Sequence, residues 1–141
     1  MNYKDYEERV QKNIERNKKI LDDFENWLKS SGLSDKTIKK HIDNVDLYIN
    51  DYLNYYDIKA AEEGYLCIND YLGDWFIRKV SWSSEYSLKQ NIASLKKFYS
   101  YLKERGMIED SDYDYMIDTI KLQKAKWLRA VNKYYEDDLF Y

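Results

Sequence analysis

The sequence predicts an all-α fold. Three observations lead to this prediction: apolar residues recur at helical spacing along most of the chain, no stretch alternates apolar and polar residues as a strand does, and no proline interrupts the 141 residues. With 44% hydrophobic and 35% charged residues, the composition is that of a folded domain with a core. We expect one helical domain over residues 1–135, built from four principal helices and one extended or paired terminus, with long amino- and carboxyl-terminal helices.

The clearest helix is predicted for residues 84–106. Its apolar residues follow spacings of four, three, four and three, which places them on one face. They are Leu88, Ile92, Leu95, Tyr99 and Leu102. A separate stripe carries Lys89, Lys96 and Lys103. Ser84 is a favourable N-cap, and Gly106 supplies a left-handed stop. One face is therefore predicted to enter the core, while another presents cations to the solvent.

Two further helices are predicted in the amino-terminal half. Residues 5–30 keep a helical period that ends at Gly32, and their sparsely apolar beginning suggests a helical extension over residues 1–19. Ser34 is predicted to cap a second helix, which runs from Asp35 to about Asn54. A short helical piece over residues 57–63, ended by Gly64, should follow.

The carboxyl-terminal half contains two more predicted helices besides residues 84–106. Asn69 is predicted to cap a strongly apolar helix from Asp70 to about Val80. Asp110 or Ser111 is predicted to cap the last helix, which should continue to about Tyr135 because no proline blocks it. Residues 136–141 are acidic and aromatic, and we expect them to form a frayed tail.

The distribution of charge is more informative than its total. The net charge of −3 does not attract nucleic acid to the chain as a whole, so such a function needs a local basic patch. Residues 86–106 carry five cations against one anion, and residues 119–135 carry five against none. Acidic residues gather between positions 43 and 74 and in residues 109–118. These runs fit either basic patches or ordinary solvated helix surfaces.

Several classes of protein are disfavoured by composition. No run of about 18 apolar residues exists, and the first residues lack the apolar segment of a secretion signal, so we expect a cytoplasmic protein without a membrane span. The single cysteine, Cys67, cannot form an internal disulfide and is most simply a small buried side chain. One histidine and one cysteine do not make a zinc site, and the scattered glycines make no phosphate loop. We therefore expect no cofactor, metal or small-molecule substrate.

Two segments of the chain carry a joint pattern. The first is Gly32-Leu33-Ser34-Asp35-Lys36-Thr37-Ile38, followed by Val45 and Tyr48. The second lies within residues 84–109 and includes Ser87-Leu88-Lys89-Gln90, Phe98-Tyr99, Tyr101-Leu102 and Gly106-Met107-Ile108-Glu109. A shift of the chain by 50 positions aligns the two helix starts. In this order and at this separation, the segments resemble the core-binding, or SAM-like, domain of tyrosine recombinases (phage integrases), over about residues 20–125.

This resemblance implies a four-helix orthogonal bundle that forms one half of a clamp around double-stranded DNA. Its second and fourth helices would lie along the major groove. The implied DNA contacts on the first of these helices are Lys36, Thr37, Lys39 and Lys40, and those on the other are Ser87, Lys89, Gln90, Lys96 and Lys97. Cations and hydroxyl groups near helix amino termini suit phosphate, and the amide of Gln90 could pair with an adenine edge.

The resemblance does not extend to catalysis. Tyrosine recombinases transfer strands with a separate domain that supplies arginines, a histidine-type donor and a tyrosine nucleophile. This chain has one histidine and no His-x-x-Arg motif, and it ends before such a domain could fit, so we expect a non-enzyme.

Two functions therefore remain open. In the first, a DNA-binding module acts alone, with a recombinase partner or as the start of a longer recombinase, and its two lysine sets converge on one concave face. In the second, a helical interaction module forms a homo-oligomer or a partner contact, with scattered lysines and an exposed apolar patch.

Overall fold

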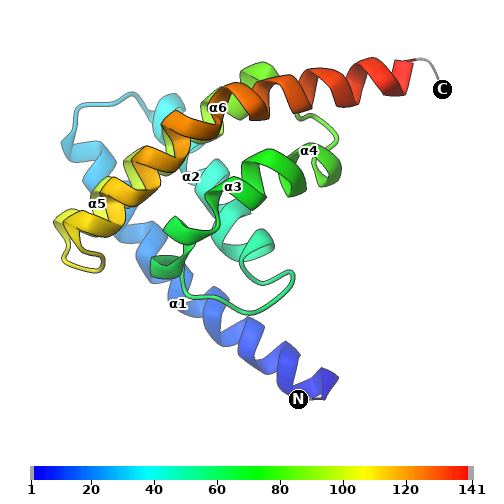
Figure 1. Ribbon diagram of the computed structural model, residues 1–141. Helices are drawn as coiled ribbons and strands as arrows, with labels where there is room; N and C mark the ends of the chain where they lie inside the picture. Colours follow the sequence, from blue (N-terminus) through cyan, green and yellow to red (C-terminus); the bar gives the residue numbers. More distant parts are fainter. Residues whose placement is uncertain (1, 140–141) are drawn as a thin grey trace. The chain divides into compact units, whose positions relative to one another are not determined.

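The computed structural model describes residues 2–139, with side chains as far as Glu136, and it confirms the all-α prediction (Figure 1). Most of the described residues lie in helices, and no strand occurs among them. None of the helices within residues 2–139 combines the length and apolar character needed to cross a membrane. The chain divides into two compact units, Met1–Gly64 and Tyr65–Tyr141. The expectation of a single domain over residues 1–135 stays a prediction.

The first unit begins with α1, which spans Tyr3–Ser30. The helix starts where the side-chain oxygen of Asn2 accepts a hydrogen bond from the Asp5 amide at 2.9 Å. It is followed by Gly32, whose φ of +77° is a conformation that residues with a Cβ rarely adopt. The predicted long first helix and its glycine stop are both confirmed.

A second helical stretch in this unit packs against α1. α2 spans Asp35–Asp46 and is capped by Ser34, as predicted. The backbone then widens into the π-helix η1, Leu47–Tyr52, so that the predicted second helix forms in two pieces. The buried amide of Asn17 on α1 donates hydrogen bonds to the Ile49 carbonyl at 3.2 Å and to the Asn50 side chain at 2.8 Å. The widened turn is therefore joined to α1 through polar contacts.

Polar side chains on the first half of α1 contact the segment that follows η1. The Tyr6 hydroxyl donates to the Asn54 carbonyl, and the Asn13 amide donates to the Asn54 side chain at 2.8 Å. Arg16 forms a two-point contact with Glu62, with N–O distances of 2.7 and 2.5 Å. These contacts explain why a sparsely apolar sequence is helical here: its polar residues have specific partners.

The connection after η1 differs from the prediction. The short helix is the 3₁₀-helix η2, Ala61–Leu66, rather than residues 57–63. Gly64 lies inside this helix and is buried, so it does not act as a stop. The predicted stop rested on the place of Gly64 at the end of residues 57–63. Its burial depends on packing instead, since the Tyr48 hydroxyl donates a hydrogen bond to the Gly64 carbonyl at 2.6 Å.

The second unit begins with one helical stretch made of three parts. These are α3 (Ile68–Asp70), the π-helix η3 (Tyr71–Trp75) and α4 (Phe76–Lys79). The predicted cap at Asn69 is wrong, because the helix already begins at Ile68. The Asn69 side chain instead accepts a hydrogen bond from the indole of Trp127 at 2.8 Å. The Asn69 side chain, which was expected to cap the helix, therefore joins α3 to α6 through Trp127.

The two remaining helices pack side by side in the second unit (Figure 1). α5 spans Glu85–Glu104, is capped by Ser84 and is followed by Gly106 with φ +74°, all as predicted. Its five predicted core residues are all buried. α6 spans Asp110–Leu139 and so continues past Tyr135 into the predicted tail, of which residues 140–141 lie outside the described residues.

The start of α6 also differs from the prediction. Asp110 is already the first helical residue, so neither it nor Ser111 is the N-cap. The carboxylate of Asp112 accepts a hydrogen bond from the Glu109 amide at 3.0 Å and closes this end of the helix.

A close approach between Gly73 and Trp127 joins η3 to α6. A Cβ built on Gly73 would lie 2.7 Å from Cδ1 of Trp127, which is closer than real Cβ contacts. The indole is buried, with 1% of its surface exposed, and its nitrogen is bound to Asn69. Only glycine therefore lets α6 sit this close to η3.

We expect the variant G73A to be destabilised. The new methyl group overpacks against Trp127, which typically costs about 1–3 kcal/mol, while the gain in helix propensity is at most about 1 kcal/mol. Urea denaturation followed by circular dichroism should show a loss of about 1–2 kcal/mol. The control is G73A in a W127A background, where no ring meets the new methyl group and most of the difference should disappear. Equal losses in both backgrounds would contradict this account.

Candidate nucleic-acid interface

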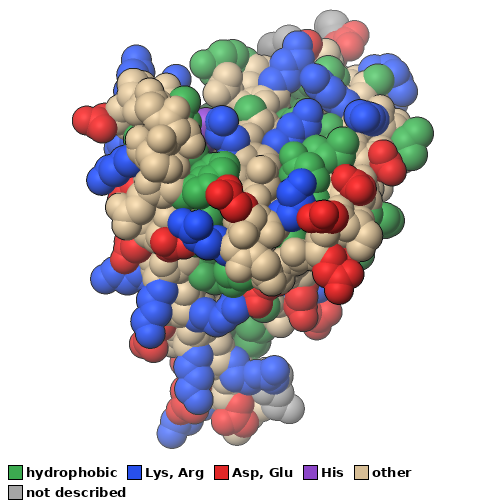
Figure 2. Space-filling model, turned by 90° about the vertical axis from the view of Figure 1, so that its left-hand side faces the viewer, with side chains coloured by type: hydrophobic (Ala, Val, Ile, Leu, Met, Phe, Trp, Pro, Cys, Tyr) green, Lys and Arg blue, Asp and Glu red, His purple; other side chains and the backbone are tan. Residues whose placement is uncertain are grey.

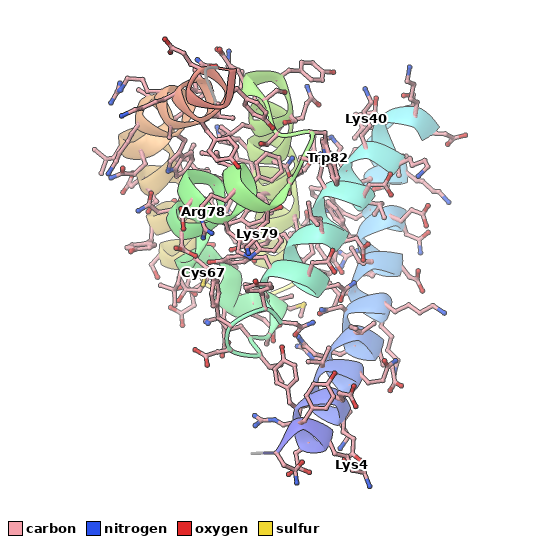
Figure 3. All side chains as sticks on the ribbon, turned by 90° about the vertical axis from the view of Figure 1, so that its right-hand side faces the viewer. Lys4, Lys40, Cys67, Arg78, Lys79 and Trp82 are labelled. Atoms are coloured by element: carbon pink, nitrogen blue, oxygen red, sulfur yellow. The ribbon has the colours of Figure 1, made fainter. Side chains whose placement is uncertain are left out.

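The predicted contacts on α2 lie at its exposed amino-terminal turns. Lys36 and Lys40 are four residues apart and therefore share a face, and neither forms an ion pair with a described residue. Figure 3 shows Lys40, which lies in the second turn of α2. Lys39 is different, because its Nζ lies 2.8 Å from the Asp43 carboxylate, and this hydrogen bond raises the pKa of Lys39. α2 thus offers two unpaired cations rather than three.

The side of α2 that carries Lys39 is not basic. A hollow between α1 and α2 brings Lys39 together with carboxylates from both helices. It is lined by Glu25, Lys29, Asp35, Ile38, Lys39, Ile42 and Asp43. With three carboxylates against two ammonium groups, this hollow does not favour a phosphate group.

Both candidate helices use hydroxyl groups to close their own amino termini. On α2, the Thr37 amide donates to the Ser34 hydroxyl at 3.2 Å, and that hydroxyl donates to Thr37 Oγ1 at 3.0 Å. On α5, Ser84 and Ser87 form a reciprocal capping box, with N–O distances of 3.0 and 2.8 Å. These bonds satisfy backbone amides that a phosphate would otherwise contact. The structure therefore places Thr37 and Ser87 in helix capping.

The first lysine of α5 has an acidic partner. Lys89 Nζ lies 3.1 Å from a Glu85 oxygen, one helical turn earlier. The other Glu85 oxygen accepts a hydrogen bond from Asn132 of α6 at 3.4 Å. Hydrogen bonding to Lys89 first, and to Asn132 second, lowers the pKa of Glu85. The charge of Lys89 is therefore partly neutralised by the Glu85 carboxylate.

Lys96 and Lys97 have no ion pair with a described residue. Lys96 is exposed, whereas Lys97 and the neighbouring candidate Gln90 are half-buried. Lys96 lies eleven residues after Glu85, which returns it to within about 20° of the same side of the helix. It therefore faces the side of α5 that borders α6.

The packing of α5 on α6 adds a cation that the sequence did not identify. Two contacts define an antiparallel register: Glu85 with Asn132, and the Lys103 ammonium 4.4 Å from the centre of the Tyr113 ring. Between these two contacts, the register brings Lys121 of α6 level with Lys96. Lys121 is exposed and has no ion pair with a described residue. In the sequence, Lys121 was marked only as one of the cations in the acid-free run over residues 119–135.

Other basic positions are less suited to bind an anion. Arg78 of α4, shown in Figure 3 with Lys79, makes two 2.8 Å bonds to Asp74, and Arg78 lowers the pKa of that carboxyl. Along the first turns of α1, at the bottom of Figure 2, Lys and Arg side chains alternate with Asp and Glu. The lysines on α2 and α5 lie in different units, and their convergence on one concave face stays a prediction.

No metal site accompanies these lysines in the described part of the chain. No group of three His, Cys, Asp or Glu side chains could hold an ion there. Cys67 lies just before α3 (Figure 3) and is half-buried rather than buried as predicted, and His41 is buried on α2.

Comparison with known proteins adds no assignment: no protein-family model matches the chain, and neither does any curated protein or solved structure.

The coupling between Glu85 and Lys89 can be measured directly. In the variant K89Q, we expect the pKa of the Glu85 carboxyl to rise, because the charged donor that stabilises the carboxylate most is replaced by a neutral amide. An NMR titration of the side-chain carboxyl carbon would show this change. The matched variant N132A removes the weaker partner and should raise the pKa less. A larger rise in N132A than in K89Q would show that Lys89 is not the dominant partner.

Proposed function

We propose that this protein is a non-catalytic, cytoplasmic module that binds duplex DNA and acts in DNA recombination or integration. The proposal includes the four-helix orthogonal architecture of the core-binding domain of tyrosine recombinases. Its support is the pattern in residues 32–48 and 84–109, together with the two capped helices that this pattern anticipates, α2 at Ser34 and α5 at Ser84. A recombinase is the partner that this function would require.

The observation that carries the proposal is the set of unpaired cations on the α5–α6 pair. We name Lys96, Lys97 and Lys121 the hairpin cations. Affinity for DNA comes from cations that neutralise phosphates and release counterions. A lysine that already has a carboxylate partner contributes less, since binding must break or share that pair. The hairpin cations have no such partner among the described residues, and so they are better placed than Lys89 to bind phosphate.

A second contact would come from α2. Lys36 and Lys40 form an exposed pair on one face of that helix and offer two further ammonium groups to phosphates. Small sets of cations of this kind support moderate, strongly salt-dependent binding rather than the tight binding of a highly basic protein. Because the net charge of the chain is −3, binding of DNA depends on such local groups of cations.

The absence of catalysis is part of the proposal. Strand transfer needs a donor beside the scissile phosphate. The one histidine of the chain, His41, is buried, with 6% of its surface exposed, so it does not offer an imidazole to a bound backbone. The role that fits is to hold DNA, while a catalytic partner acts on it.

Binding can be tested by fluorescence anisotropy with a labelled random duplex. We expect saturable binding that weakens with salt, with a log–log slope of roughly −0.9 per phosphate contact. Measurements at several salt concentrations would give the number of contacts. No binding at low salt would exclude the proposed function.

Charge-reversal variants test which part of the protein binds DNA. We expect K96E/K97E/K121E to abolish binding or to reduce the magnitude of the salt slope by roughly three, since each lysine contributes about one. The control K12E/K18E/K19E makes the same change in net charge at exposed positions of α1 and should retain most of the slope. Equal losses in the two variants would show that overall charge, rather than the hairpin cations, controls binding.

A further inference from the structure

One side of α6 is exposed along most of the helix. At about 100° per residue, a set of its side chains falls within an arc of about 80°, and all of them are exposed. They are Ser111, Tyr115, Asp118, Leu122, Lys126, Arg129 and Lys133. We name this set the outer arc of α6. The opposite side carries the buried residues Met116, Ile120, Trp127 and Val131.

The centre of the outer arc is apolar. Leu122 exposes 79% of its surface, and Tyr115, two turns earlier, exposes 54%. Tyr115 also contacts the ring of Tyr65 edge-on, with 6.3 Å between centroids, which extends the apolar surface sideways. A leucine this exposed in the middle of a long helix is a position where a partner surface would gain from burial.

Charge on the outer arc reverses at Leu122. Asp118 lies four residues before it and Lys126 four residues after it, while Tyr115 and Arg129 lie seven residues before and after. None of the three charged residues forms an ion pair with a described residue. More widely, acids occupy residues 109–118, and residues 119–135 carry cations alone. The outer arc is therefore complementary to its own reversed copy.

We propose that two copies of this chain associate through the outer arc, with their α6 helices antiparallel across a twofold axis at Leu122. In this arrangement Leu122 meets Leu122 of the second copy, and Asp118 meets Lys126. Tyr115 faces Arg129, a favourable cation–π pairing. Because the axis is twofold, each contact occurs twice. A parallel arrangement would instead place acids against acids and cations against cations.

A second copy fits this surface better than DNA does. Asp118 and the acidic first turns of α6 would repel a phosphate backbone, whereas they attract the basic half of a second α6. The arc residues also differ from the hairpin cations, so the inference does not rest on the proposed function. The contact is small and partly electrostatic, so we expect a weak, salt-sensitive dimer.

The first test is sedimentation velocity of the full chain over a range of concentrations from micromolar to near millimolar. The wild-type protein should shift from monomer toward dimer as concentration rises, and added salt should oppose the shift. L122E should remain monomeric with unchanged helicity by circular dichroism. A wild-type protein that is monomeric throughout would overturn the proposal.

The register is tested by reversing charges. D118K and K126D each place like charges together in both contacts of the dimer, so each variant alone should be monomeric. When the two variants are mixed, every contact pairs opposite charges, and a dimer containing one copy of each should form. The control K124D changes an exposed lysine of α6 outside the outer arc and should dimerise like the wild type.

Two results would contradict this arrangement. Failure of the mixed variants to associate, while the wild type dimerises, would exclude the antiparallel register. Loss of DNA binding in K126E/R129E/K133E from a protein that never dimerises would assign the outer arc to DNA instead.

Discussion

The contact between Trp127 and Gly73 determines which sides of α6 are buried and exposed. Since glycine leaves no Cβ, the indole sits against η3 and donates its N–H to Asn69. A buried, hydrogen-bonded ring fixes the rotation of a helix about its own axis. The outer arc then faces the solvent, and Lys121 is brought to the border with α5. The candidate surfaces of the second unit thus depend on one close approach in its core.

Pairing, rather than the number of lysines, decides where an anion could bind. Lys39 and Lys89 each have a carboxylate one turn away on their own helix, whereas Lys96 has none. The hydroxyl groups of Thr37 and Ser87 serve their own helix ends. Local partners of this kind stabilise the helices and reduce the charge available to a ligand. The most accessible positive charge therefore lies further along α5 and on α6.

Much of the fold follows from local sequence. Periodic apolar residues gave the buried face of α5, and the caps at Ser34 and Ser84 and the glycine at position 106 marked helix ends that the structure confirms. Two of the failed predictions have a common cause. Asn69 was predicted as a cap, but its partner Trp127 is 58 residues away, and Gly64 is held by the Tyr48 hydroxyl rather than ending a helix. In both cases, contacts between residues far apart in the sequence determine the role of the residue.

The sequence by itself determined the helical class, the long terminal helices and the acid-free cation run of residues 119–135, because these depend on residue spacing and charge along the chain. Only the tertiary structure decided which faces of the helices are exposed and which cations of neighbouring helices lie level. Helical periodicity cannot tell whether Leu122 meets solvent or a neighbour, or that Lys96 and Lys121 lie level. Those properties depend on how one helix is rotated and shifted against another, and packing between residues far apart in sequence sets both.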